Sequence, residues 1–328
     1  MSTLLEIENL RVRFRSLGLF RAMLTGVDDP YIDAVCGVSL QVREGETVGL
    51  VGESGSGKST IARTIMGLTP AHPGSSIRFE GQELSGLGQG GYKTHRRHMA
   101  MMFQDPVGSL SPRLTVRSLV TEPFRVHGIT GRDLDAEAKR LLEMVGLSED
   151  FARRFPHQLS GGQARRVGAA RALALNPKLI IADEPTAGLD VSVQGEVLNL
   201  LARLQDELGI SILIITHNLN VVRHITDRMA IMYLGRFVEQ GPTEEIFAKP
   251  RHPYTEALLS ANPEPDPDAR HERVEITGEV PSLMNRPTGC EFHTRCPRAT
   301  DKCAQIAPGE SRAGDRHVYT CHFPLNSG

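Results

Sequence analysis

The stretch Gly52-Glu53-Ser54-Gly55-Ser56-Gly57-Lys58-Ser59 decides the fold class, because it fits the phosphate-binding pattern GxxxxGK(S/T). The apolar run 47–51 before it is typical of a buried strand, and residues 59–66 after it have the composition of a helix. The backbone N–H groups of such a loop and the positive end of the following helix form a concave polyphosphate site. We expect this site to comprise Gly52, Glu53, Ser54, Gly55, Ser56, Gly57, Lys58, Ser59 and Thr60.

Within this loop the last two pattern residues have separate roles. Lys58 is expected to reach the β- and γ-phosphates, and Ser59 to place its hydroxyl on Mg²⁺. The alternative is a flexible glycine turn before an ordinary helix, which the GKS ending and the flanking elements disfavour. The sequence therefore predicts a nucleotide site with ATP and Mg²⁺ as ligands.

Composition limits the other classes of function. The 328 residues, 40% of them hydrophobic, suffice for one large α/β domain with an accessory piece, but not for two ATPase units. A formal net charge of −2 provides no general basic field for nucleic acid, although Arg96–His98 or Arg165–Arg166 could form a local patch. The N-terminus has neither a secretory nor a mitochondrial leader pattern, and no window reaches the roughly 18 apolar residues of a membrane span. We expect a cytoplasmic chain that serves a membrane only by docking onto other subunits.

Apolar runs that alternate with amphipathic helices predict an α/β fold with a covered parallel sheet. Residues 4–51 predict a β-rich segment, with strands at 5–10 and 38–42 around a less regular insertion. Prolines then become frequent near the C-terminus, which places a boundary near 245–265. Further elements are expected as a helix at 132–145, a strand at 179–182, a helix at about 191–208, a strand at 211–216, a helix at about 221–225 and a hairpin at 229–240.

Two carboxylates follow the predicted strand at 179–182. Because ligands bind outside the carboxyl ends of parallel strands, Asp183 is expected to hold Mg²⁺ through water, and Glu184 to polarise the attacking water. An acidic turn after a core strand is the alternative. Two acids in two roles predict hydrolysis of the nucleotide rather than its storage.

Serine and glycines also open a further predicted helix at 164–173, and such a helix end binds anions. The residues concerned are Leu159, Ser160, Gly161, Gly162 and Gln163. Together with the glycine loop, the Asp-Glu strand end and Ala187-Gly188-Leu189-Asp190, they resemble the ATP-binding-cassette (ABC) family. In that family the LSGGQ signature of one subunit closes on the nucleotide held by the other. The resemblance therefore implies that this segment acts in trans, on the γ-phosphate of a partner's ATP.

The same resemblance gives roles to single residues elsewhere. Gln104 matches the glutamine that senses Mg²⁺ and the attacking water and connects the site to transmembrane subunits. Asp190 matches the aspartate that crosses the dimer interface, and His217 the switch histidine on the γ-phosphate. Phe14 matches the aromatic that stacks on adenine, with Tyr31 as a rival. The implied catalytic residues are Glu184, His217 and Gln104, and the implied Mg²⁺ ligands include Ser59 and Gln104.

The family also implies a domain organisation. A RecA-like core with an antiparallel β subdomain and a helical subdomain at about 105–175 would occupy residues 1–250, and a small extension residues 251–328. Ala164 and Arg165 depart from the arginine and glutamine that commonly follow the signature. The core of the motif is intact, and no catalytic position is degenerate.

Three strings, at 103–113, 190–194 and 251–260, are similar to the oligopeptide, dipeptide and nickel importer ATPases. The resemblance implies an ATPase at the cytoplasmic face of the inner membrane that powers peptide uptake. Its implied partners are a second ABC ATPase, favoured as a paralogue, two transmembrane permeases and, indirectly, an extracytoplasmic solute-binding protein. Alternatives are another solute, such as nickel, glutathione or a sugar-like compound, export, or an ABC ATPase that acts on nucleic acid.

Four of the five cysteines lie near the C-terminus: Cys290, Cys296, Cys303 and Cys321. In a cytosolic ATPase a clustered quartet is better explained by metal binding than by disulfides. Peptide-importer ATPases are similar in carrying such a tail around a 4Fe–4S cluster, which four thiolates suit. Zn²⁺ or free thiols remain alternatives, although the short spacing of zinc ribbons is missing. Cys36 stands apart and is expected to be a small buried residue.

Overall fold

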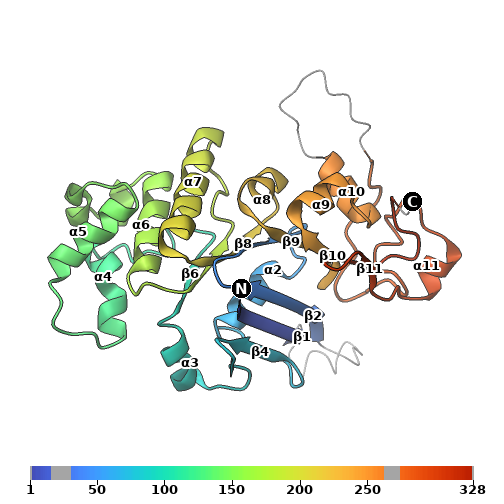
Figure 1. The fold of residues 1–328 in the computed structure, drawn as a ribbon, viewed down its shortest axis with the longest axis horizontal. Helices are drawn as coiled ribbons and strands as arrows, with labels where there is room; N and C mark the ends of the chain where they lie inside the picture. The colour runs from blue at the N-terminus through green and yellow to red at the C-terminus, as the bar shows by residue number, and fades with distance from the viewer. Residues whose placement is uncertain (1, 16–30, 262–273, 327–328) are drawn as a thin grey trace, which may run out of the picture. The chain divides into compact units, whose positions relative to one another are not determined.

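The computed structural model describes residues 2–15, 31–261 and 274–326 (Figure 1). These residues group into two compact units, each with its own internal contacts. Unit 1 consists of Met1–Leu4, Val42–Thr47 and Leu87–Ile215. Unit 2 consists of Leu5–Gln41, Val48–Gly86 and Thr216–Gly328. The irregular insertion expected between the first two strands falls largely on residues 16–30, outside the described part.

A four-stranded sheet in unit 2 provides the predicted antiparallel β subdomain. Its strands are ordered β2 (Tyr31–Arg43), β1 (Thr3–Arg15), β4 (Ser76–Phe79) and β5 (Gln82–Glu83). Figure 1 labels the first three of them. β4 pairs antiparallel with both β1 and β5. Alternation of apolar and polar residues along β1 buries one face, as expected for a half-covered strand.

A second set of strands in unit 2 carries the phosphate loop. β3 (Thr47–Val51) runs parallel to β9 (Arg228–Tyr233), and β9 forms an antiparallel hairpin with β10 (Arg236–Pro242). This is the hairpin expected at 229–240. β12 (His317–Tyr319) pairs with β10, and β11 (Ser311–Ala313) pairs with β12, so the C-terminal segment extends the sheet. No pattern in the sequence predicts these last two strands.

Unit 1 holds a parallel sheet of β6 (Met99–Met102), β7 (Leu179–Asp183) and β8 (Ser211–Thr216). β7 is buried along its whole length, which explains its unbroken apolar sequence. The helix α7 (Val191–Leu208) has the bounds expected from the sequence, and Gly209 ends it with φ 65°. These elements confirm the α/β class.

The helical part of unit 1 lies between β6 and β7 in the chain. It contains α4 (Val116–Val126), α5 (Leu134–Met144) and α6 (Gly161–Leu173), which Figure 1 shows as a green group. Asp133 caps α5 by accepting the N–H groups of Asp135 and Ala136, so this helix begins two residues later than the pattern at 132–145 suggested. The helical subdomain expected from the resemblance is present.

The described part of the chain contains no helix that is both long and apolar enough to cross a membrane.

Remaining short elements complete both units. In unit 2, Asn218 caps α8, which therefore starts two residues before the expected position. The other helices are α2 (Lys58–Ile65), α3 (Gln89–His95), α8 (Leu219–Ile225), α9 (Thr243–Ala248), α10 (Pro253–Ser260) and α11 (Asp301–Gln305), with 3-10 turns at Glu149–Arg153 and Pro156–Gln158.

The C-terminal extension shares a hydrophobic core with the β9–β10 hairpin. Tyr254 of α10 and Phe292 are both buried among the side chains of β9, and their rings lie 5.3 Å apart. Tyr233 at the end of β9 contacts both rings, at centroid distances of 4.8 and 5.3 Å. The extension is therefore anchored by aromatic packing as well as by its strands.

Candidate functional site

The phosphate loop of unit 2 is shaped by left-handed glycines. Gly57 is the N-cap residue of α2 with φ 108°, so the backbone turns directly into the helix that Lys58 begins. The ammonium of Lys58 donates to the carbonyls of Gly52 and Glu53 at 2.7 and 2.9 Å, and to Ser56 Oγ at 3.3 Å. These bonds hold the lysine over the concave side of its own loop.

The loop also packs closely against its surroundings in unit 2. A Cβ added at Gly52 would lie 2.2 Å from the carbonyl oxygen of Met232, and one at Gly57 would lie 2.4 Å from that of Ala34. The Gly235 N–H donates to the Ser56 carbonyl at 2.9 Å, which joins the loop to the β9–β10 turn. The loop is thus a rigid support for a ligand, not a flexible glycine turn.

In unit 1 the carboxyl ends of β6 and β7 meet at one edge of the sheet. Met102 pairs with Ala182, so Gln104 and the pair Asp183–Glu184 follow neighbouring strand ends. Asp183 and Glu184 are 3% and 8% exposed. The exposed Gln104 begins a loop in which Asp105 accepts the N–H of Gly108 at 2.9 Å.

Glu184 has an unusual backbone. Its φ is 49°, a left-handed value that is costly for a residue with a side chain. Its N–H donates to the carbonyl of Ile215 on β8 at 2.8 Å, which holds the strained conformation in place. Such strain is characteristic of functional positions.

The signature segment begins α6 with a capping box. Ser160 Oγ accepts the Gln163 N–H at 3.3 Å, and Gln163 Oε1 accepts the Ser160 N–H at 3.0 Å. A Cβ at Gly162 would lie only 2.8 Å from Val193 Cγ1, so a glycine permits close packing against α7. The N-terminal turn of α6 is therefore preorganised.

The two arginines after the signature point inward within unit 1. Arg165 is buried and donates to the carbonyl of Ala187, just before Asp190. Burial lowers the pKa of Arg165, while Asp105 acts in the opposite direction. Arg166 binds the Val145 carbonyl and Glu196, so the pair forms internal links and not a basic patch.

The other predicted site residues lie at exposed positions. Asp190 is the exposed N-cap residue of α7, and the exposed His217 directly follows β8. Phe14 and Tyr31 stand on the neighbouring strands β1 and β2, and both are exposed. The Arg13 guanidinium covers the Tyr31 ring at 5.4 Å, which leaves Phe14 as the better candidate for an adenine contact.

The four clustered cysteines line one small cavity of about 10 Å³ in unit 2. The pKa of Cys321 is raised to about 11, mainly by burial and also by the nearby thiols of the three other cysteines, against a backbone hydrogen bond from Phe323. The same two causes raise the pKa of Cys290 and of Cys296, against local hydrogen bonds. In the described ranges no three His, Cys, Asp or Glu side chains are arranged to hold one metal ion. The donor set nevertheless suits an iron–sulfur cluster, which spreads four thiolates around itself.

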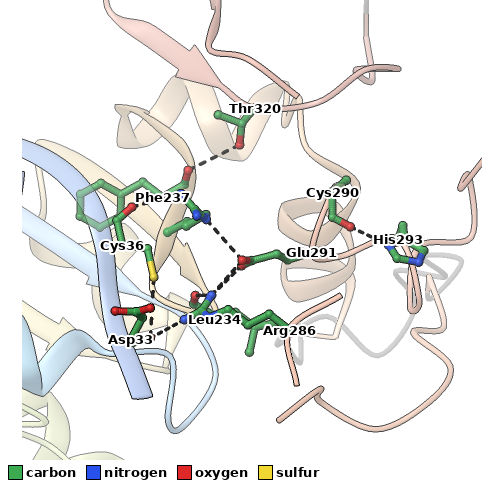
Figure 2. A network of polar contacts seen from close by, with 10 residues as sticks. Asp33, Cys36, Leu234, Phe237, Arg286, Cys290, Glu291, His293 and Thr320 are labelled. Carbon is green, nitrogen blue, oxygen red and sulfur yellow. Dashed lines mark hydrogen bonds and ion pairs between the residues drawn. The ribbon is translucent and has the colours of Figure 1, made fainter. Parts of the chain in front are cut away.

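A polar network ties the extension to the rest of unit 2 (Figure 2). Arg286 donates to both oxygens of Glu291 at 2.9 and 3.0 Å and to the Leu234 carbonyl at 2.6 Å. It also binds the Asp33 carbonyl at the start of β2. Arg236 bridges Glu291 and the Cys36 carbonyl. Cys36 is half-buried, and its pKa is raised mainly by burial.

Sequence reasoning missed the residues of the extension that touch the phosphate loop. Arg295 and Tyr254 both bind Glu53. The string 251–260 around Tyr254 carries the family resemblance, but nothing in it indicates a contact with the phosphate loop; in the structure it begins α10, with Pro253 in the first turn. No local pattern marks Arg295, because its partner lies 242 residues away in the chain.

Comparison with known proteins agrees with this geometry. The sequence model of the ABC transporter family matches residues 35–187, and that of the oligopeptide/dipeptide transporter C-terminal region matches residues 238–303. The chain is 46% identical to the oligopeptide transport ATP-binding protein AppF of Bacillus subtilis, over 98% of this chain and 97% of AppF. It is 47% identical to OppF of Salmonella typhimurium, described in the same words, over 88% of this chain and 87% of OppF.

Solved structures give the same result. A dimeric post-hydrolysis structure of the ATP-binding cassette MJ0796 with ADP and phosphate is 30% identical, with a TM-score of 0.64 over 73% of this chain and 98% of that one. CbiO1 of Clostridium perfringens is 29% identical, with a TM-score of 0.63 over 76% and 92%. The glycine loop, the Asp-Glu strand end and the capped signature helix are thus those of an ABC cassette. The chain belongs to the ATP-binding subunits of the ABC transporters, in the group that carries the oligopeptide/dipeptide transporter C-terminal region.

Proposed function

We propose that this chain is the ATP-hydrolysing subunit of an ABC importer for di- and oligopeptides. The observation that carries the proposal is the combination of an ABC match at 35–187 with an oligopeptide/dipeptide transporter match at 238–303. AppF and OppF, both named oligopeptide transport ATP-binding proteins, match this chain over 97% and 87% of their own length. Residues 1–250 would form the ATPase domain, with a helical subdomain at about 105–175, and residues 251–328 the extension.

The proposed chemistry distributes charge around the triphosphate. The N–H groups of the phosphate loop and Lys58 bind the β- and γ-phosphates, while Ser59, Gln104 and Asp183 hold Mg²⁺ directly or through water. Glu184 orients and polarises the attacking water. The role of the protein is positioning and electrostatic stabilisation, because the phosphoryl group itself needs little covalent assistance.

Two further contributions complete the proposed active site. His217 contacts the γ-phosphate, and Phe14 stacks on the adenine. The signature segment 159–163 and Asp190 act on the nucleotide of a second ABC ATPase, as a capped helix N-terminus suits an anion. The dimeric MJ0796 structures support pairing of cassettes, and we propose a paralogue as the partner here.

The proposed assembly places this chain at the cytoplasmic face of the cell membrane. Two transmembrane permeases contact the ATPase pair, and an extracytoplasmic solute-binding protein delivers peptide to them. The ATPase subunits then never touch the peptide. One of the two candidate basic patches, Arg165–Arg166, makes contacts inside unit 1, and we propose no nucleic-acid partner.

Reconstitution tests this proposal. The complete assembly in proteoliposomes, with its solute-binding protein, is expected to hydrolyse ATP at least several-fold faster when a mixture of peptides is added, because peptide delivery promotes closure of the ATPase pair. Phosphate release and uptake of a labelled tripeptide are the measurements. Nickel, glutathione and a disaccharide serve as competing solutes, and stimulation by one of these in place of peptides would contradict the peptide assignment.

We also propose that Cys290, Cys296, Cys303 and Cys321 hold a 4Fe–4S cluster. The four thiols lie around one cavity, and they must lose protons to bind iron, so loading offsets the raised thiol pKa values. Such a cluster would brace the segment 290–321. It has no part in the hydrolysis proposed above.

Anaerobically purified protein is expected to absorb at about 400 nm and to contain iron and acid-labile sulfide. Cys303→Ser should lose this absorbance, because Cys303 is a buried member of the quartet. Cys36→Ser is the matched control and should retain it, since Cys36 lies outside the cavity. Zinc without sulfide would assign the site to Zn²⁺, and neither metal would leave four free thiols; both results contradict the cluster.

A further inference from the structure

Within unit 2, the C-terminal extension binds the phosphate loop through an ion pair between Arg295 and Glu53. Arg295 Nη1 lies 2.8 Å from Glu53 Oε2, and Arg295 Nη2 lies 3.0 Å from Glu53 Oε1. The side chain of Arg295 is 8% exposed and that of Glu53 27%. Two parallel N–H···O bonds between planar groups fix the orientation as well as the distance. The second residue of the glycine loop is therefore held by a residue of the extension.

The backbone of Glu53 is bound on both of its sides. Its N–H donates to Tyr254 Oη at 3.1 Å, and its carbonyl accepts from Lys58 Nζ at 2.9 Å. Burial raises the pKa of Tyr254 well above the usual range, so its hydroxyl stays protonated at neutral pH. Glu53 thus connects the ammonium of Lys58 directly to two residues of the extension.

Arg295 is itself held in place by contacts within the extension and with β9. The Arg295 guanidinium lies over the Tyr233 ring at 5.8 Å, and the Arg295 N–H donates to the Phe292 carbonyl at 3.0 Å. Val280, Pro281 and Leu283 line a cavity of about 200 Å³ together with residues 53–56 of the loop. The extension therefore borders the phosphate loop over several residues.

We propose that Arg295 is a positioning residue for ATP binding, which acts through Glu53 to orient Lys58. This inference rests on the nucleotide site proposed above and adds a residue that supports it. The extension would then contribute to the affinity for nucleotide. Loss of the ion pair should raise KM for ATP and leave kcat nearly unchanged, since the water-activating residues are elsewhere in the chain.

Binding of mant-ATP with Mg²⁺ to the full-length chain tests the proposal. Arg295→Met and Glu53→Gln are each expected to raise the Kd about 5- to 20-fold, the effect of losing a charge-assisted bidentate contact. Arg295→Lys should restore part of the affinity, because lysine keeps the positive charge but cannot make the two parallel hydrogen bonds of the guanidinium. The double variant should bind about as weakly as either single variant, since both remove the same contact.

Arg236→Met is the matched control. Arg236 also pairs with an acid of the extension, Glu291 at 3.3 Å, but it is exposed and does not touch the phosphate loop. Its Kd should equal that of the wild type. Thermal melting without nucleotide checks that each variant is folded, and Glu53→Gln, which changes a single atom, keeps the test decisive should Arg295→Met fail to fold.

The outcomes separate this inference from the nucleotide site on which it rests. Lys58→Ala should abolish mant-ATP binding; if it binds like the wild type, the proposed nucleotide site itself is wrong. If Lys58→Ala loses binding while the folded Glu53→Gln and Arg295→Met variants keep the wild-type Kd and KM, only the positioning role is refuted. Fully additive effects of the two substitutions would also refute it, because each side chain would then act alone.

Discussion

Replacing Glu184 by Gln is expected to lower the rate of ATP hydrolysis by about 100- to 10,000-fold, the usual contribution of a general base. The amide keeps the shape of the side chain and its place after β7, but it cannot take a proton from water. Binding of Mg²⁺-ATP should be unchanged, and with the partner ATPase present the variant should accumulate as a nucleotide-bound dimer. Phosphate release gives the rate, and gel filtration with ATP shows the dimer.

Glu207→Gln is a suitable control for this prediction. It removes one carboxylate from the same unit, at an exposed position near the end of α7, and should hydrolyse ATP at the wild-type rate. Hydrolysis by Glu184→Gln above a tenth of the wild-type rate would show that another group activates water. Glu184→Gly should also abolish turnover, and glycine accepts the left-handed φ of this position without steric strain.

Sequence could predict the ATPase core because its signals are local. A strand such as β7 is buried along its length and therefore has an unbroken apolar sequence, and α7 ends where Gly209 allows the left-handed turn. The glycines of the phosphate loop are also explained by local conformation, since Gly52 and Gly57 adopt backbone angles that other residues avoid. Each of these features is decided by a few consecutive residues.

The extension could not be predicted in the same way. β11 and β12 are only three residues long, and they form because β10 offers a free edge, which no periodicity in their own sequences reveals. Arg295 looks like any surface arginine until the fold brings Glu53 to it. The gathering of four cysteines around one cavity was anticipated, yet from the resemblance and their number, and not from the spacing.

The hairpin β9–β10 was predictable from local sequence, and it also makes the long-range contacts that the sequence does not reveal. It was visible in the sequence, and in unit 2 it supports the phosphate loop through Gly235 and the extension through Tyr233. A site built on such a hairpin is positioned by regular structure, which favours precise geometry. The same arrangement explains why a change in the extension can reach the phosphate loop within one unit.

Gly52→Ala is expected to destabilise the folded chain by roughly 3–5 kcal/mol, because a Cβ at this position meets a backbone atom and the backbone angle also disfavours it. The added carbon would lie 2.2 Å from the Met232 carbonyl oxygen, and φ at Gly52 is 154°. Met232 belongs to β9, whose hydrogen bonds to β3 and β10 leave it little freedom to move. The melting temperature without nucleotide should fall by roughly 6–10 °C in calorimetry.

Gly55→Ala separates the close contact from the backbone angle. Gly55 belongs to the same loop and has φ 82°, but an added Cβ would meet nothing within 4 Å. Its cost should be only about 1 kcal/mol, from the left-handed conformation alone. If both variants melt together, the packing of Gly52 against β9 contributes nothing, and the phosphate loop owes its shape to its own backbone preferences. If Gly52→Ala melts several degrees below Gly55→Ala, the loop is held in place by the β9–β10 hairpin on which the extension also rests.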